Sequence, residues 1–281
     1  KGYIAASVFQ ERLRQLGQKS IQEICKELVI SEENVPLFFI SAFLIKGVIE
    51  VTGAKLIWAP GVTLCDGIAY DYAQENRMLS QFHDFEQDII ACAKSTSKRY
   101  QGSRRRGEAL EQITLAIYDS MKKVHGLGKR ERLLLRIASL LYDCGKFMSL
   151  SSVGECSYQI IMSTEIIGLS HAEREIVANV VKYNDVEYAY YDQMSKQYGL
   201  TRQEYLVISK LTAILRLAST LDTRRNLKID NVKASIHEEE LWIQVETTEN
   251  IELERGLFSE NGAFFEEVYN IHPMLKLKRT M

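Results

Sequence analysis

Asp143 is the first residue that could do chemistry, because it lies in the stretch LLYDCGKFM at residues 140–148, where an apolar run ends in Asp-x-Gly. A carboxylate in this position could take part in metal or acid–base chemistry. It could instead hydrogen-bond a nearby helix end or a tyrosine, and lone carboxylates at helix ends usually serve structure. We favour the structural interpretation of Asp143.

The basic run KSTSKRYQGSRRRGEAL at residues 94–110 is the second candidate. Arginine side chains hold phosphate oxygens with two parallel hydrogen bonds, and a linear polyphosphate requires a track of such cations. The alternative is a solvated helix-loop-helix surface that balances nearby acids. Both interpretations stay open. The predicted polyphosphate-binding residues are Lys98, Arg99, Arg104, Arg105 and Arg106.

The histidines and cysteines give little support to metal or redox chemistry. No histidine has a partner at His-x-x-x-His spacing, and no Cys-x-x-Cys pair occurs. The dipeptide His83-Asp84 is expected to be a polar pair near a helix start. Cys144 and Cys156 could be redox sensors, but buried, inert thiols are much commoner. A nucleophile elbow of the form Gly-x-Ser-x-Gly is also absent from the sequence.

Arg216 lies in the apolar segment LRLASTLD, where a cation must find a partner. We predict an internal ion pair with a carboxylate such as Asp143 or Asp222, and favour this over a contact with phosphate.

Composition limits the classes of partner. The chain has 281 residues, of which 46% are apolar and 26% charged, and its net charge of -2 provides no global attraction to nucleic acid or anionic membranes. We find no apolar run of the ~18 residues that a membrane helix needs and no signal-peptide layout. These features predict a cytoplasmic protein. The first residue is not Met, which suggests a piece of a longer chain.

The spacing of apolar residues predicts a mainly α fold. Residues 1–75 look like mixed α/β structure, with helical patterns in SIQEICKELVI and VPLFFISAFLIKGVIEVTG and a short strand in AKLIW. A period of 3.6 residues predicts a bundle of helices near 76–99, 107–124, 130–143, 155–166, 171–184 and 202–222. Alternation in VKASIH and LWIQVE predicts a hairpin, followed by a helix and a last strand.

Several separated segments, in order, resemble the C-terminal half of exopolyphosphatases and guanosine pentaphosphate phosphohydrolases. They include GVTLCDGIAYDYA, IYDSMKKVHGL, LLLRIASLLYDCGKF, CSYQIIMSTEIIGLSHAEREIVANVVKY, LTAILRLASTLD and FFEEVYNIHPMLKLKR. The resemblance implies three domains. Residues 1–75 would end an actin-like lobe, residues 76–225 would form an HD-like helical domain, and residues 226–281 a small α+β domain.

The HD-like domain of the resembled family implies a set of metal-ligand positions, which hold His or Asp in active HD hydrolases. Only Asp143 of these positions keeps such a residue here. One carboxylate with a thiol and an arginine does not make a divalent metal site, because several converging donors are needed. Tyr142 and Asp143 thus form a degenerate HD position, and no metal ligand or catalytic residue is expected. The carried-over positions are Arg106, Tyr142, Asp143, Cys156, Asn184 and Ser219.

The resemblance further implies that a terminal phosphoanhydride of polyphosphate or guanosine pentaphosphate is hydrolysed in a preceding actin-like domain, aided by a divalent cation such as magnesium. No glycine-rich phosphate motif is found in this sequence. The present region would bind the polyanion and form a homodimer, without a cofactor of its own. One alternative is a catalytically silent HD-like module that binds a regulatory nucleotide or a protein. The least favoured is an active HD phosphohydrolase with unusual ligands.

Overall fold

The computed structural model describes residues 2–79, 83–221, 231–246 and 252–278, and the chain divides into two units, 1–82 and 83–281. In the first unit, β1 (Tyr3–Ala5) pairs antiparallel with β2 (Leu56–Trp58). The Ser20 hydroxyl and the Glu23 carboxylate form a capping box that starts α2. The sequence predicted α2, α3 and β2, but missed β1, α1 and α4. The helices of this unit are α1 (Ala6–Leu16), α2 (Ile21–Leu28), η1 (Glu32–Asn34), α3 (Val35–Thr52) and α4 (Leu64–Glu75).

Helix α3 differs from the expectation that no apolar segment is long enough to span a membrane. Together with η1 it forms a 21-residue helical segment, Glu32–Thr52, with a mean hydropathy of 1.8, which is long and apolar enough to cross a membrane by length and composition. No continuous apolar run marks this segment in the sequence, because Lys46 and Glu50 interrupt it; these two side chains pair with each other at 3.6 Å. Core helices of soluble proteins meet the same two criteria, so this feature alone does not assign a membrane span.

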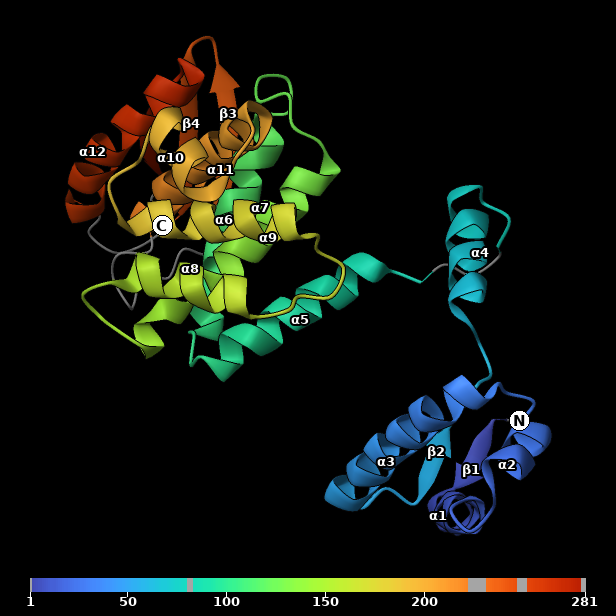
Figure 1. Ribbon diagram of the computed structural model, residues 1–281. Helices are drawn as coiled ribbons and strands as arrows, with labels where there is room; N and C mark the ends of the chain where they lie inside the picture. Colours follow the sequence, from blue (N-terminus) through green and yellow to red (C-terminus); the bar gives the residue numbers. More distant parts are fainter. Residues whose placement is uncertain (1, 80–82, 222–230, 247–251, 279–281) are drawn as a thin grey trace. The chain divides into compact units, whose positions relative to one another are not determined.

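The second unit is a helical bundle with a small sheet (Figure 1). Its core helices are α7, α9 and α11, and α11 buries side chains along most of its length. This arrangement confirms the prediction of a mainly α fold. The sequence missed α10, which is short and polar. The helices are α5 (Phe85–Arg99), α6 (Arg104–Ser120), α7 (Lys129–Leu141), η2 (Cys144–Phe147), α8 (Val153–Ser163), α9 (His171–Asp185), α10 (Tyr191–Tyr198), α11 (Arg202–Thr220) and α12 (Glu252–Tyr269).

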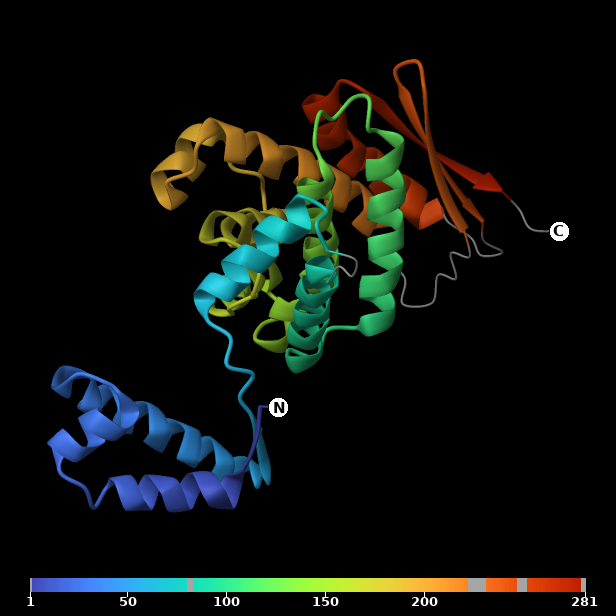
Figure 2. The ribbon, with the colours of Figure 1, turned by 90° about the vertical axis from the view of Figure 1, so that its right-hand side faces the viewer.

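The C-terminal segment completes this unit. Strands β3 (Asn231–His237) and β4 (Glu240–Glu246) form the predicted hairpin, and β5 (His272–Lys278) joins β4 in parallel after α12 crosses over. Figure 2 shows the three strands side by side at the edge of the bundle. β3 packs against α6 and α12 packs against α11, so Ile243 and Phe265 belong to the same core as the helices. The predicted separate domain at 226–281 therefore differs from the structure, in which the sheet shares the helical core.

Arg216 of α11 joins three helices without an ion pair to any described carboxylate. Its guanidinium donates hydrogen bonds to the backbone carbonyls of Tyr183 and Val186 at the end of α9. It also lies 4.9 Å from the ring centroid of Phe264 on α12 and 5.9 Å from that of Tyr188. The predicted ion pair with Asp143 is wrong, because carbonyls at the negative end of a helix dipole take the place of a carboxylate. Asp222 lies outside the described residues.

We expect Arg216→Ala to lower the free energy of unfolding of the second unit by about 2–4 kcal/mol, since two partly buried carbonyls lose a charged donor. Urea denaturation followed by Trp242 fluorescence, in a Trp58→Phe background, measures this unit alone. Arg202→Ala is the matched control, because Arg202 lies on the same helix, also above an aromatic ring, but is exposed. Equal losses in the two variants would contradict this role for Arg216.

Candidate functional site: a basic pocket between two helices

The predicted basic run spans the end of α5 and the start of α6, where the chain forms a pocket of about 460 Å³. Lys94 and Lys98 lie one turn apart on α5, and Arg104 opens α6 on the opposite side. Neither lysine makes an ion pair with any described residue, whereas the Nε of Arg104 lies 2.8 Å from an oxygen of Glu108. The charged side chains around the pocket are thus three cations and one carboxylate, an arrangement that attracts anions.

The start of α6 strengthens this attraction. Ser103 caps the helix, and its hydroxyl accepts the amide of Arg106 at 3.5 Å. The first turn holds three arginines and no acidic residue. Cations are unfavourable at a helix N-terminus, where the helix dipole is positive, and an anion bound there would offset both charges.

The other predicted site residues lie around this pocket and do not line it. Arg99 and Arg105 are exposed in the last turn of α5 and the first turn of α6. Arg106 is half-buried, and its guanidinium carbon lies 5.8 Å from the ring centroid of Tyr142. The structure thus brings Lys98 and Arg104 together, adds Lys94, and directs Arg106 to a different place.

The positions that resemble former metal ligands are occupied by groups that contact one another. Arg106 packs over Tyr142, and Asp143 is buried with an oxygen 3.7 Å from the Nζ of Lys146. Between α11 and α9, the Ser219 hydroxyl donates to the side-chain oxygen of Asn184 at 3.1 Å. The positive charge of Arg106, at one of these positions, would repel a metal ion.

These residues therefore do not fit a divalent cation. Among the residues that the structure describes, no three His, Cys, Asp or Glu side chains are placed to hold a metal ion. Burial raises the pKa of the Cys144 thiol to about 11, so this cysteine is a thiol at neutral pH and a poor nucleophile or ligand.

Gly145, from the Asp-x-Gly of the sequence, allows η2 and α8 to approach closely. A Cβ at this position would lie 2.2 Å from the carbonyl oxygen of Val153 and 2.6 Å from the amide nitrogen of Ser157. The Gly145 amide donates to the Ser157 hydroxyl at 2.9 Å. The glycine of the Asp-x-Gly motif thus serves a close packing contact between the backbones of η2 and α8.

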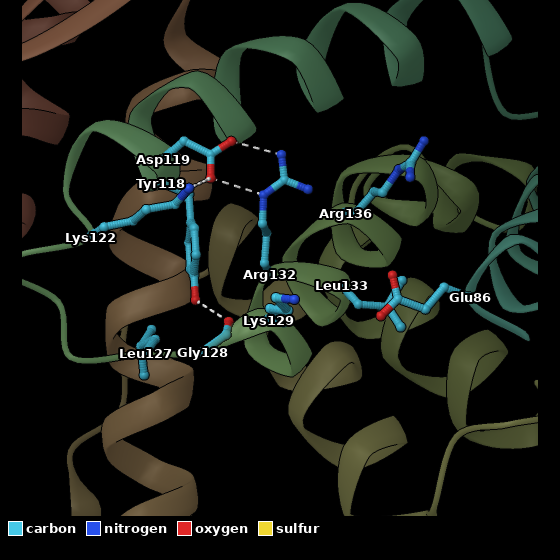
Figure 3. A pocket seen from close by; sticks show the side chains of 10 residues that line it. All are labelled: Glu86, Tyr118, Asp119, Lys122, Leu127, Gly128, Lys129, Arg132, Leu133 and Arg136. Carbon is cyan, nitrogen blue, oxygen red and sulfur yellow. Dashed lines mark hydrogen bonds and ion pairs between the residues drawn. The ribbon is translucent and has the colours of Figure 1, made fainter. Parts of the chain in front are cut away.

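Sequence reasoning missed a second cavity, of about 580 Å³, which is bounded by α5, α6 and the first half of α7 (Figure 3). Arg132 donates from Nε and Nη2 to the two carboxylate oxygens of Asp119 at 3.0 and 2.7 Å. This contact lowers the pKa of Asp119 and keeps it ionised. The sequence contains one signal for this cavity, because the spacing of Lys129, Arg132 and Arg136 places all three on one face of a helix.

His125 is fully buried in the turn behind this cavity. Its Nε2 lies 3.1 Å from the carbonyl oxygen of Tyr118, and its Nδ1 accepts the amide of Leu127 at 2.9 Å. Nδ1 therefore carries no proton in the folded state. Burial lowers the pKa of His125 below its ordinary value, and the nearby charge of Lys210 acts in the same direction.

Comparison with known proteins agrees with the resemblance. The family model described as Ppx/GppA phosphatase, domain III, matches residues 90–261, which is more than half of the chain. The matched range contains the basic pocket and all of the second cavity's lining residues except Glu86. No curated protein matches the chain.

We expect Gly145→Ala to destabilise the second unit by about 3 kcal/mol, because backbone atoms of α8 would have to move to admit the methyl group. Gly256→Ala is the matched control: a Cβ there meets nothing within 4 Å, and α12 should gain about 0.5–1 kcal/mol. Thermal and urea unfolding of both variants test this. A neutral Gly145→Ala would show that the close approach is not required.

His125 should make stability depend on pH. Below about pH 6.5 the unfolded chain binds a proton at this residue while the folded chain does not, so stability falls as pH falls, by at most about 1.4 kcal/mol per pH unit. The difference between the unfolding free energies at pH 7.5 and pH 5.5 should therefore be smaller in His125→Asn than in the wild-type protein. The control is His171→Gln, an exposed histidine, which should keep the wild-type dependence. An unchanged dependence in His125→Asn would refute the assignment.

Proposed function

Because the chain belongs to the Ppx/GppA phosphatase family, we propose that its helical unit binds the polyanionic substrate of a phosphohydrolase, with polyphosphate as the ligand. The observation that carries this proposal is the pair Lys94 and Lys98, which line a pocket opposite Arg104 and have no described ion-pair partner. Unpaired lysines beside the start of a helix form a site that a phosphate chain would neutralise.

The exposed Arg99 and Arg105 support a track longer than one phosphate group. They flank the pocket on the last turn of α5 and the first turn of α6, so a linear anion that leaves the pocket would meet a further cation. Many weak contacts of this kind suit a polymer, because each can be released without losing the whole chain. Guanosine pentaphosphate, with fewer phosphates, would use fewer of these contacts.

We propose that the hydrolytic step takes place outside the residues of this chain, where magnesium would shield phosphate charge. The former ligand positions support this assignment, because they are filled by an arginine, a tyrosine and a paired Ser219 and Asn184. The proposal includes a cytoplasmic homodimer, in which two basic pockets could act on one long polyanion.

Calorimetric titration with polyphosphate at two salt concentrations tests the proposal, using the double variant Lys94→Ala/Lys98→Ala. We expect the affinity to fall about tenfold or more. The affinity should also depend less steeply on salt concentration, because about two fewer counterions are released on binding. The matched control is Lys196→Ala, since Lys196 is an exposed lysine in the last turn of another helix, α10.

Unchanged binding in the double variant would remove the pocket from the substrate path. An absence of polyphosphate binding at low salt would contradict the proposal as a whole and favour a regulatory or partner-binding module.

A further inference from the structure

The second cavity has the features of a separate anion site. Its charged lining consists of four cations and two carboxylates, so it carries an excess of two positive charges. Figure 3 shows Glu86 on the opposite side of the cavity from Asp119 and Lys122. The charged residues are Lys122, Lys129, Arg132, Arg136, Glu86 and Asp119.

Two arginines in this lining are held in place by carboxylates of α6. Arg132 is fixed by Asp119 through Nε and Nη2, and Arg136 is fixed by Glu111 through Nε. Within the described chain, Nη1 of Arg132 and both terminal nitrogens of Arg136 make no hydrogen bond. Side chains that are already ordered lose little entropy when they bind a ligand.

Lysines complete the cationic part of the lining. Lys129 opens α7 and makes no ion pair with any described residue. The Nζ of Lys122 lies 3.3 Å from Asp119, which it shares with Arg132. An ammonium group that is flexible and two guanidinium groups that are fixed, on one helix face, can surround a compact tetrahedral anion.

We propose that this cavity binds a phosphoryl group of about two negative charges, either as free phosphate or as the end of a phosphate chain. It is separate from the proposed polyphosphate pocket. That pocket lies at the other end of α6, where Leu140 and Gly107 line it, whereas Tyr118 and Asp119 line this cavity. Two sites of this kind could hold two parts of one polyanion or two different anions.

The experiment titrates inorganic pyrophosphate into the full chain by calorimetry at low salt. Lys129→Ala should weaken binding about tenfold through loss of one charged contact, and Arg132→Lys should weaken it although the charge is kept. The matched control is Lys123→Ala, an exposed lysine next to Lys122 that lies outside the cavity and should keep wild-type affinity. Because Lys129 makes no described ion pair, its variant tests binding without loss of folding contacts.

The variant Lys94→Ala/Lys98→Ala separates this inference from the proposed function. If the cavity is a site of its own, pyrophosphate binding persists in that double variant and falls in Lys129→Ala. Loss only in the double variant would overturn the inference and leave the polyphosphate pocket intact. Equal affinity in Lys129→Ala, Arg132→Lys and Lys123→Ala, or no pyrophosphate binding at low salt, would also overturn it.

Discussion

The contact between the half-buried guanidinium of Arg216 and the end of α9 is the interaction on which the helical unit depends. It lies on the central helix α11, where removal of a cation from water is costly unless strong acceptors replace the water. The carbonyls of Tyr183 and Val186 supply these acceptors at the end of α9, and the ring of Phe264 brings α12 to the same point. Helix α7 packs against α9, and it contributes Leu140 to the basic pocket and Lys129, Arg132 and Arg136 to the second cavity.

Direct contacts between side chains join the positions that the resemblance aligns with the ligands of HD hydrolases. The Ser219 hydroxyl lies 3.1 Å from the side-chain oxygen of Asn184 on α9 and 2.9 Å from the carbonyl oxygen of Arg216, so its contact with Asn184 joins α11 to α9. Neutral hydrogen bonds need no bound ion for stability, whereas a cluster of carboxylates and imidazoles would repel itself without one. Arg106 over Tyr142 serves the same purpose at the start of α6.

Local sequence signals predicted much of the fold. The Ser-x-x-Glu pattern at Ser170 forms the expected capping box, and Asp84 caps α5 as a polar residue near a helix start. The interactions between distant segments could not be predicted. Arg216 finds its partner carbonyls at least 30 residues away, and a carbonyl gives no signal in the sequence. For the candidate sites, the sequence grouped Lys98 with Arg104, and both line one pocket, but it gave no indication of the cavity around Arg132, whose position depends on Asp119 in another helix.

The two cavities hold their cations in different ways, and this difference bears on what each could bind. Lys94 and Lys98 are exposed and unpaired, so they can follow a flexible chain and exchange contacts with solvent. Arg132 and Arg136 are fixed by half-buried or buried carboxylates, whose negative charge offsets part of the local positive field but which set the direction of the guanidinium groups. Mobile lysines suit a polymer that must slide, and fixed arginines suit one phosphoryl group that must be held in one orientation.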